Sequence, residues 1–384
     1  MEHLSSRKFV ETGAKALIAA ALVVFIYINA LFVIGSSNDL YDFGSFIASG
    51  QLASAGKNPY STESPLILQV EFPKINHSGI SPNLNPPISV MLFLIIEDAD
   101  PHKSATVWRI LTIILYIFSM VLLHQSHPDH PRSLWLVAWS LSLAGFWHTV
   151  LLGQIYMPFV LAAVGAWILI KNGQFTWGGI LLGTLIAIKP NFIFWALTLL
   201  AIGNWVAFLS AGITAIMISA IPLFFYGIKI YIQWLDAVAA YTPNLLIFPG
   251  NNSLQGLTSR FGSAQAGVIL SIILGGSVLF YIYKNKTSTA STNALGVLTS
   301  LLISPLAWPS YMLLALPMFF AKNQWTWRLW IAAILFAIPF YFPLRLFDRS
   351  FFNFVFFGWF YGWGLLLLLA DVLIETKKQP EYHV

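Results

Sequence analysis

The chain has 384 residues, of which 58% are hydrophobic and only 9% are charged, whereas roughly 25% are charged in a typical soluble domain. This composition excludes a soluble globular protein, because such a fold cannot hide so much apolar surface. The net charge of +5 is spread over short segments between apolar runs, which argues against nucleic-acid binding. The absence of cysteine excludes disulfides, thiolate metal sites and cysteine nucleophiles.

The long apolar runs predict membrane-spanning helices. A helix needs about 20 apolar residues to cross the hydrocarbon core, and within lipid only helices or closed barrels satisfy every backbone polar group. Because the runs lack the alternation of barrel strands, we predict an all-α polytopic transmembrane helical bundle, with residues 1–384 as one membrane-embedded domain. The first run, residues 16–34, is longer than a signal-peptide core and is predicted to be an uncleaved first span.

The longest polar stretch comes next, over residues 36–85, and is rich in Ser, Asn, Pro and Gly. We predict that it is the first outer loop, with short surface helices and the active site. Residues 88–96 are apolar but cover only roughly half of the hydrocarbon thickness, so a re-entrant or short helix is expected there.

If residues 88–96 do not cross the membrane, the later basic connections all fall inside, as the positive-inside rule requires. This arrangement places both termini in the cytoplasm and the segments rich in Pro, Asn, Trp and Asp outside. It predicts about twelve crossings, with the first run followed by spans near 105–123, 133–151, 155–170, 176–188, 191–207, 209–226, 266–283, 292–305, 310–321, 328–343 and 352–373.

The first candidate for chemistry is the acidic start of the outer loop. Asp42 precedes Phe43, and Asp39 lies one turn earlier. A carboxylate just beyond the first span is well placed to deprotonate an acceptor hydroxyl as a general base. The alternative is a solvated loop start or a helix cap. Farther along the same loop stand Gly56 to Tyr60 and the Pro-Asn-Leu-Asn-Pro-Pro segment of residues 82–87, which is typical of a rigid helix start.

Two further blocks lie at predicted helix ends. Gly153-Gln154 is followed closely by Tyr156, and Lys189-Pro190-Asn191 ends a span. An ionisable side chain at membrane depth favours a functional role, here binding of a lipid phosphate. A lysine that snorkels to the interface is the competing interpretation.

The last blocks are rich in amides and aromatics. Asn251 to Gly256 is followed by Arg260, whose guanidinium suits phosphate oxygens; an ordinary capped turn is the alternative. Trp308 and Tyr311 follow Ser304-Pro305 and suit stacking on a sugar, although the interfacial aromatic belt also explains such residues.

Histidines near residues 124–130 invite a metal interpretation. His124, His127, Asp129 and His130 lie close in sequence, but their spacing is broken by proline and lacks the helical pattern of a zinc site. We therefore expect no metal there, and the absence of a Gly-rich phosphate loop argues against nucleotide-driven chemistry.

These blocks, taken in order, resemble glycosyltransferase family 87 of the GT-C superfamily, whose members include polyprenyl-phosphate-mannose-dependent mannosyltransferases. The resembling pieces are Asp42-Phe43, Gly56 to Tyr60, Pro86-Pro87, Gly153-Gln154, Lys189-Pro190, Asn251 to Gly256 and Ser304 to Trp308. The chain departs from the family pattern after Trp308, where Ser310 and Tyr311 stand instead of a nearby histidine.

The resemblance implies an inverting transfer, usually without a bound metal or other cofactor, from a polyprenyl-phosphate-linked sugar, with mannose the first expectation. The acceptor would be a glycolipid or a cell-envelope glycan at the outer face of a bacterial or archaeal plasma membrane. The expected catalytic base is Asp42 or Asp39, and the donor phosphate would be bound by Lys189 and Arg260. Sugar or acceptor contacts are expected from Tyr60, Gln154, Asn191, Asn252, Trp308 and Tyr311.

Two other functions remain open from the sequence. A lipid-linked sugar flippase or transporter would need charged residues within several spans, yet Lys189 is the main such residue. If the protein were a non-catalytic assembly partner, replacement of Asp42 would leave the membrane glycans unchanged.

Overall fold

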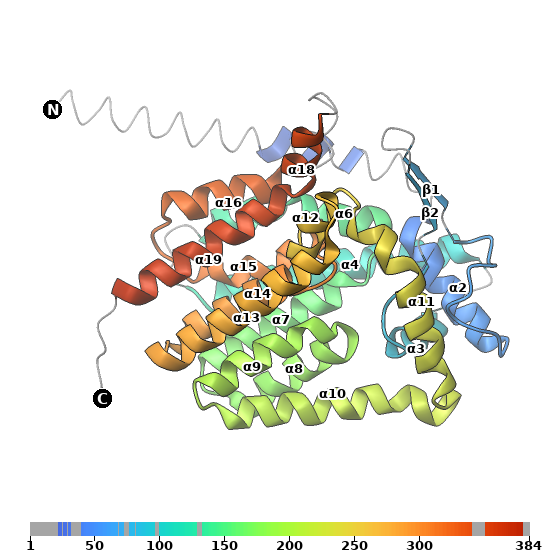
Figure 1. Cartoon of the computed structure of the whole chain (residues 1–384), viewed down its shortest axis with the longest axis horizontal. Coiled ribbons are helices and arrows are strands. Elements are labelled where there is room, and N and C mark those ends of the chain that lie inside the picture. The colour runs from blue at the N-terminus through green and yellow to red at the C-terminus, as the bar shows by residue number, and fades with distance from the viewer. Residues whose placement is uncertain are drawn as a thin grey trace.

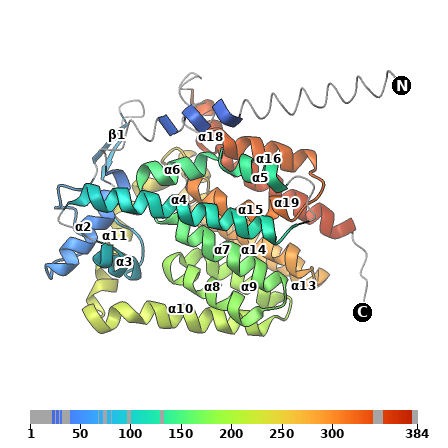
Figure 2. The same cartoon turned by 180° about the vertical axis from the view of Figure 1, so that it is seen from behind.

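The computed structural model describes residues 22–24, 26–28, 30–31, 40–67, 69–72, 77–80, 82–96, 100–128, 133–339 and 350–378. Within these ranges the chain is a bundle of helices with one short antiparallel hairpin (Figures 1 and 2). Its elements are α2 (Tyr41–Ser54), β1 (Gln69–Phe72), β2 (His77–Ile80), α3 (Ile88–Ile96), α4 (Pro101–Gln125), α5 (Ser133–Ser140), α6 (Ala144–Leu152), α7 (Tyr156–Lys171), α8 (Phe175–Ile188), η2 (Pro190–Phe192), α9 (Ile193–Ala201), α10 (Trp205–Tyr226), α11 (Lys229–Leu246), α12 (Leu254–Arg260), α13 (Ala264–Asn285), α14 (Thr289–Ile303), η3 (Pro309–Ala315), α15 (Leu316–Phe320), α16 (Trp327–Ala337), α18 (Phe351–Gly358) and α19 (Phe360–Lys378).

Small residues bring α8 and α10 into close contact. Gly179 and Gly183 lie one turn apart on α8 and face Ala207 and Ala211 on α10. A Cβ on Gly179 would lie 2.6 Å from the carbonyl oxygen of Ala207. This small-xxx-small pattern lets two backbones approach where lipid supplies no hydrophobic driving force between helices.

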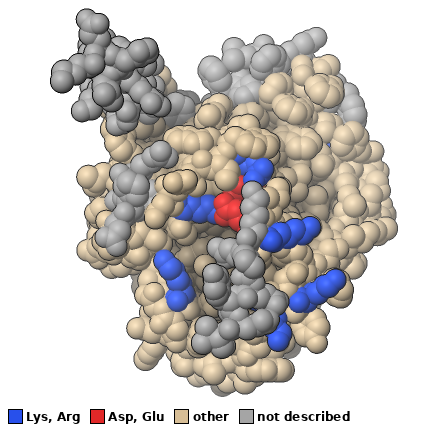
Figure 3. All heavy atoms as spheres, turned by 90° about the vertical axis from the view of Figure 1, so that its left-hand side faces the viewer, with Lys and Arg blue, Asp and Glu red and all other residues tan. Residues whose placement is uncertain are grey.

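Basic side chains gather at one end of the bundle. α13 and α19 both end on the left-hand side of Figure 1, and Lys284 and Lys377 lie in their last turns. Figure 3 shows Lys and Arg side chains gathered on that face. α2, α3, the hairpin and α11 lie at the opposite end, where α10 joins α11. The predicted basic connections are thus concentrated at one end.

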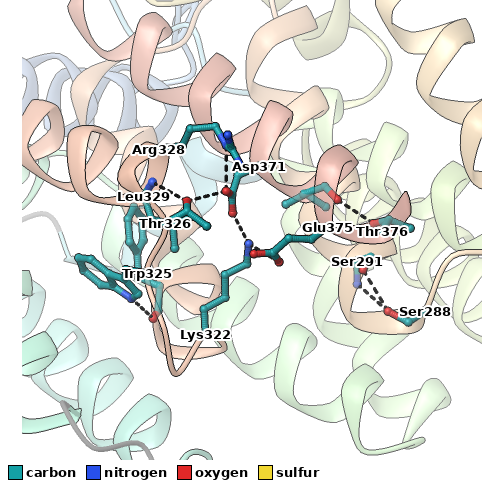
Figure 4. Close-up of polar contacts among 12 residues, drawn as sticks. Ser288, Ser291, Lys322, Trp325, Thr326, Arg328, Leu329, Asp371, Glu375 and Thr376 are labelled. Atoms are coloured by element: carbon teal, nitrogen blue, oxygen red, sulfur yellow. Dashed lines mark hydrogen bonds and ion pairs between the residues drawn. The ribbon is translucent and has the colours of Figure 1, made fainter. Parts of the chain in front are cut away.

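A buried carboxylate holds the basic end together (Figure 4). Asp371 on α19 is fully buried and accepts hydrogen bonds from Thr326 at 2.6 Å and from the Arg328 Nε at 3.0 Å. Lys322 pairs with Asp371 and also with Glu375, the latter at 2.7 Å. A buried charge is tolerated only when it is paired, so this network fastens the segment between α15 and α16 to α19.

The prediction of a helical membrane protein is confirmed, but the count of about twelve spans is not. Among the described residues, three helices are long and apolar enough to cross a membrane, namely α4, α10 and α13. α5 and α6 make a fourth if their bent pair is a single span, and six further apolar helices are shorter. The first predicted span, residues 16–34, lies mostly outside the described residues.

Several predicted spans are broken in the structure. The span expected at 133–151 is split into α5 and α6, which meet at 45°. The one at 310–321 is largely a 3₁₀ helix, η3, which ends at Ala315. The short α15 follows with Pro317 in its first turn, where the missing N–H of proline is tolerated. The one at 352–373 breaks between Gly358 and Phe360. There the Gly358 carbonyl accepts from the backbone of Gly250 and from Arg260 instead of a residue on α19.

The first outer loop has both predicted and unpredicted structure. α2 is a helix directly after residue 40, and α3 spans the predicted short piece, Ile88–Ile96. The hairpin of β1 and β2, with Gln69 opposite Ile80, is a departure from the all-α prediction. Its four-residue strands are too short for hydrophobic periodicity to reveal them.

Candidate active site

Asp42 lies in the first turn of α2 and is partly exposed. Its carboxylate accepts a hydrogen bond from the Gln154 side-chain amide. Gln154 is itself held in place, because its backbone carbonyl accepts from the Trp108 indole at 3.2 Å and its backbone N–H donates to Thr149 at 3.0 Å. Two blocks that are 112 residues apart in sequence therefore meet side chain to side chain.

Gly153 allows this meeting. It ends α6 in the left-handed conformation, with φ of 64°, which glycine adopts without strain. A Cβ at this position would lie only 2.6 Å from the Cβ of Phe43. Phe43 is fully buried and packs against Phe93 and Trp108. The close approach of Gly153 to Phe43 thus positions the neighbouring Asp42 against Gln154.

The variant Gly153→Ala is expected to lose activity through this contact. The methyl group must displace Phe43 and, with it, the start of α2, and positive φ adds strain. We expect kcat to fall by at least about tenfold, because a shift of roughly 1 Å at a catalytic group has effects of this order or more. Gly173→Ala, which also has positive φ but meets no atom within 4 Å, is the control for backbone strain alone. Equal kinetics for the two variants would contradict the packing argument.

Lys189 lies at the end of α8 and points toward the same region. Its ammonium donates to the Asn85 side chain at 2.8 Å and to the Tyr156 hydroxyl at 3.4 Å. It also lies 5.0 Å from the centre of the Tyr156 ring and 5.3 Å from that of Tyr311, within the range of cation–π attraction. Lys189 is therefore a directed cation with uncharged partners.

Hydrogen bonds within its own segment orient the Asn85 side chain toward Lys189. The Asn83 side chain accepts from the Asn85 backbone N–H at 3.0 Å and from its side-chain amide at 2.9 Å, which leaves the Asn85 Oδ1 for Lys189. The Tyr60 hydroxyl donates to the Asn85 carbonyl at 3.0 Å. Burial raises the pKa of Tyr60 well above its ordinary value, so the phenol stays protonated as a donor.

Gln154 and Tyr156, two residues apart in the chain, contact the two charged groups. The Gln154 amide donates to Asp42, and the Tyr156 hydroxyl accepts from Lys189. The Tyr156 ring meets that of Tyr311 edge to face, with centroids 4.7 Å apart. Asp42 and Lys189 are therefore bound by the same short segment, at the start of α7. The resulting site has a carboxylate, an ammonium and two aromatic rings at one end of the bundle.

A second group of predicted residues has a structural role. Asn252 is fully buried; its side chain donates to the carbonyls of Gly250 and Ala307 and accepts from the backbone N–H groups of Tyr361 and Gly362. All of these partners belong to the protein. We therefore assign Asn252 to the junction of three segments rather than to a sugar.

Arg260, like Asn252, is buried and hydrogen-bonds to the backbone of more than one segment. Its Nη2 donates to the carbonyls of Phe248, Asn251 and Gly358 at 3.1, 2.5 and 3.0 Å. Burial lowers the pKa of Arg260 to about 9, which leaves it protonated at neutral pH. Within the described residues its Nε and Nη1 have no hydrogen-bond partner, so part of its donor capacity is unused.

The remaining predicted residues, Asn191 and Trp308, contact other segments of the bundle. The Asn191 amide donates to the Ser300 carbonyl at 3.2 Å, which ties η2 to α14. Trp308 is half-buried and packs edge to face on Phe248, at 5.7 Å between centroids. Asp39 lies outside the described residues, so Asp42 is the predicted base that the structure locates.

Sequence reasoning missed two members of the site, Asn85 and Tyr156, as functional side chains. Asn85 lies within the Pro-Asn-Leu-Asn-Pro-Pro segment, and Tyr156 belongs to the Gly153-Gln154 block, but neither side chain was predicted to contact a ligand. Their contact with Lys189 depends on pairs 104 and 33 residues apart. No feature of the neighbouring sequence indicates a contact between residues so far apart.

The histidine region contains no gathered ligands among the residues that the structure describes. His127 instead hydrogen-bonds Ser126 and Lys171, both near 3.1 Å. Asp129 and His130 lie outside the described part of the chain.

The comparisons with known proteins identify the family of the chain. No curated protein and no solved structure matches the chain. A family model, glycosyltransferase family 87, matches residues 83–305, which is more than half of the chain. The matched region includes Asn85, Gln154, Tyr156 and Lys189, whereas Asp42 precedes it and contacts it through Gln154. The chain therefore belongs to glycosyltransferase family 87, as the order of its motifs predicted.

Proposed function

We propose that this membrane glycosyltransferase transfers a sugar, with mannose the first candidate, from a polyprenyl-phosphate donor to a glycolipid or cell-envelope glycan at the outer face of the membrane. The observation that carries the proposal is that Asp42 and Lys189 contact Gln154 and Tyr156, two neighbouring residues of one segment. The transfer needs a base that removes the acceptor proton and a cation that stabilises the departing phosphate, and these two side chains supply both at one site.

In the proposed reaction Asp42 removes the proton from the acceptor hydroxyl as its oxygen attacks the anomeric carbon. The bond between that carbon and the phosphate oxygen breaks at the same time, and polyprenyl phosphate leaves with the bonding electrons. The attack comes from the side opposite the phosphate, so the configuration at the anomeric carbon inverts. Gln154 orients the carboxylate through the hydrogen bond to Asp42.

Lys189 is proposed to stabilise the negative charge of the departing phosphate. Its present partners, Asn85 and Tyr156, are neutral, so the ammonium is not neutralised within the protein by these contacts. A preorganised cation at a place where charge develops lowers the barrier more than it strengthens ground-state binding. Arg260 is a secondary candidate because two of its nitrogens lack partners among the described residues.

Replacement of Lys189 tests this role. For Lys189→Ala we expect kcat/KM for the polyprenyl-phosphate sugar to fall by about 10²-fold or more, as on removal of one donor to a developing anion. Lys171→Ala is the matched control, because Lys171 also ends a helix, α7, but hydrogen-bonds His127. The measurement is initial-rate transfer of radiolabelled sugar by purified protein. Similar losses for both lysines would contradict the assignment.

The overall proposal is tested with the wild-type protein and two donors, polyprenyl-phosphate mannose and polyprenyl-phosphate arabinose. We expect label to enter membrane glycolipid from one of them, with a product anomer opposite to that of the donor. Donor movement across reconstituted vesicles without label transfer would favour a flippase. Binding without either transfer or movement would favour a non-catalytic partner.

A further inference from the structure

A polar groove of about 680 Å³ lies at the same end of the bundle as the candidate site. One wall is the segment after α2, with Lys57 and Glu63, and the other is α11, with Lys229, Gln233 and Asp236. The volume falls within the range of about 300–1,000 Å³ that is usual for small-ligand sites. These side chains take no part in the proposed proton transfer or in stabilising the departing phosphate.

The groove exists because α11 has three distinct faces. Ile230 and Ala237 are buried, and the Trp234 indole donates to the Leu84 carbonyl at 3.0 Å, so one face packs on the loop before α3. Ile232 and Leu235 are 53% and 56% exposed on another face, as suits a helix that lies against lipid. The third face carries the side chains that line the groove, at the helical spacing of three and four residues.

The side chains that line the groove include as many positive as negative charges. Two lysines, Lys57 and Lys229, face the same groove as Glu63 and Asp236. Within the described residues none of these four side chains, nor that of Gln233, makes a hydrogen bond or ion pair with the protein. A phosphate site would have an excess of cations. Balanced, unpaired donors and acceptors instead suit an uncharged ligand with many hydroxyl groups.

The groove connects with the candidate site in two ways. Leu52 lines it and lies ten residues after Asp42 on α2, a separation of about 15 Å along the helix. Tyr60 also lines it, and the Tyr60 hydroxyl donates to Asn85, the partner of Lys189. One monosaccharide does not reach from the base to the groove, whereas a chain of several sugars does.

We propose that this groove is a distal acceptor subsite, which binds the inner sugars of an extended, uncharged glycan while the terminal hydroxyl reaches Asp42. The proposal rests on the proposed transferase function and specifies its acceptor. The enzyme then prefers oligosaccharide acceptors to single sugars. The lipid-facing side of α11 keeps the groove at the membrane surface, where a glycan carried on a lipid is presented.

The first test is the dependence of KM on acceptor length. Glycolipids from the membranes of the producing cells are fractionated by glycan length and used as acceptors with excess donor. For wild type we expect KM to fall as the glycan lengthens. The double variant Gln233→Ala, Asp236→Ala should raise KM for long glycans by about tenfold, as expected for loss of two hydrogen-bonding groups, with kcat retained. Ile232→Ala, on the lipid-facing side of α11, should match wild type.

The second test does not depend on turnover. A long-glycan acceptor with a diazirine on an inner sugar is photolysed with the full-length protein, and the labelled peptides are identified by mass spectrometry. Label within residues 57–63 or 229–241, lost in the double variant, supports the subsite. Label only elsewhere overturns it, as does a KM that is independent of glycan length in an active enzyme. Absence of transfer to every fraction counts against the proposed function, and the labelling result then decides on the groove by itself.

Discussion

Replacement of Asp42 by asparagine is expected to abolish sugar transfer while leaving the protein folded and able to bind donor. Asparagine keeps the size of the side chain and an oxygen that can accept from Gln154, but it cannot take a proton from a hydroxyl. Loss of a positioned general base typically costs 10²–10⁴-fold in rate, so kcat should fall by at least about 10³-fold. The donor KM should stay near its wild-type value.

The measurement is transfer of radiolabelled sugar to glycolipid by purified wild-type protein and Asp42→Asn side by side. Asp100→Asn is the matched control, because Asp100 is a partly exposed carboxylate at the start of α4 with no proposed role in transfer. Asparagine at this position can still accept from the His102 backbone N–H. Equal rates for wild type and Asp42→Asn would keep the enzyme but move the base to Asp39 or another residue. Loss of folding is checked by gel filtration and by donor binding.

Gln154→Ala separates positioning from proton removal. The carboxylate remains in this variant but loses the amide that orients it. A smaller loss in kcat than in Asp42→Asn is expected, because the base is still present in part of the population.

The second large effect is expected on stability. Asp371→Asn removes the buried negative charge that Lys322 and Arg328 share, and removal of one member of a buried ion pair typically costs 3–5 kcal/mol. We expect the free energy of unfolding to fall by about 3 kcal/mol, because Glu375 still pairs with Lys322 and asparagine can still accept from Thr326. Thermal unfolding in detergent, followed by tryptophan fluorescence, measures the change as a lower Tm.

Glu375→Gln is the control for Asp371→Asn. The Glu375 side chain is 41% exposed, and an exposed pair contributes at most about 1 kcal/mol. Below its unfolding temperature Asp371→Asn should retain transfer activity, since α2 and the C-terminal turns of α19 lie at opposite ends of the bundle (Figure 1). An unchanged Tm would show that the network is not needed for stability.

The sequence by itself determined the class of protein and indicated several residues of the candidate site. Apolar runs this long have few stable solutions other than membrane helices, and the order of short motifs identified the family. Asp42, Gln154 and Lys189 were recognisable because carboxylates, amides and lysines at the ends of apolar helices are costly and therefore stand out from the pattern. Periodicity also located α3 at Ile88–Ile96.

Only the tertiary structure decided where helices break and what each polar residue contacts. Gly358 leaves the helical pattern because Gly250 and Arg260 bind its carbonyl, and these partners are about 100 residues away in sequence. Asn252 resembled a ligand-binding residue locally, yet its hydrogen bonds end on the protein backbone. The groove beside α11 likewise needs two segments that sequence does not pair. Periodicity reports on neighbours three or four residues apart, whereas these contacts form only when distant segments pack.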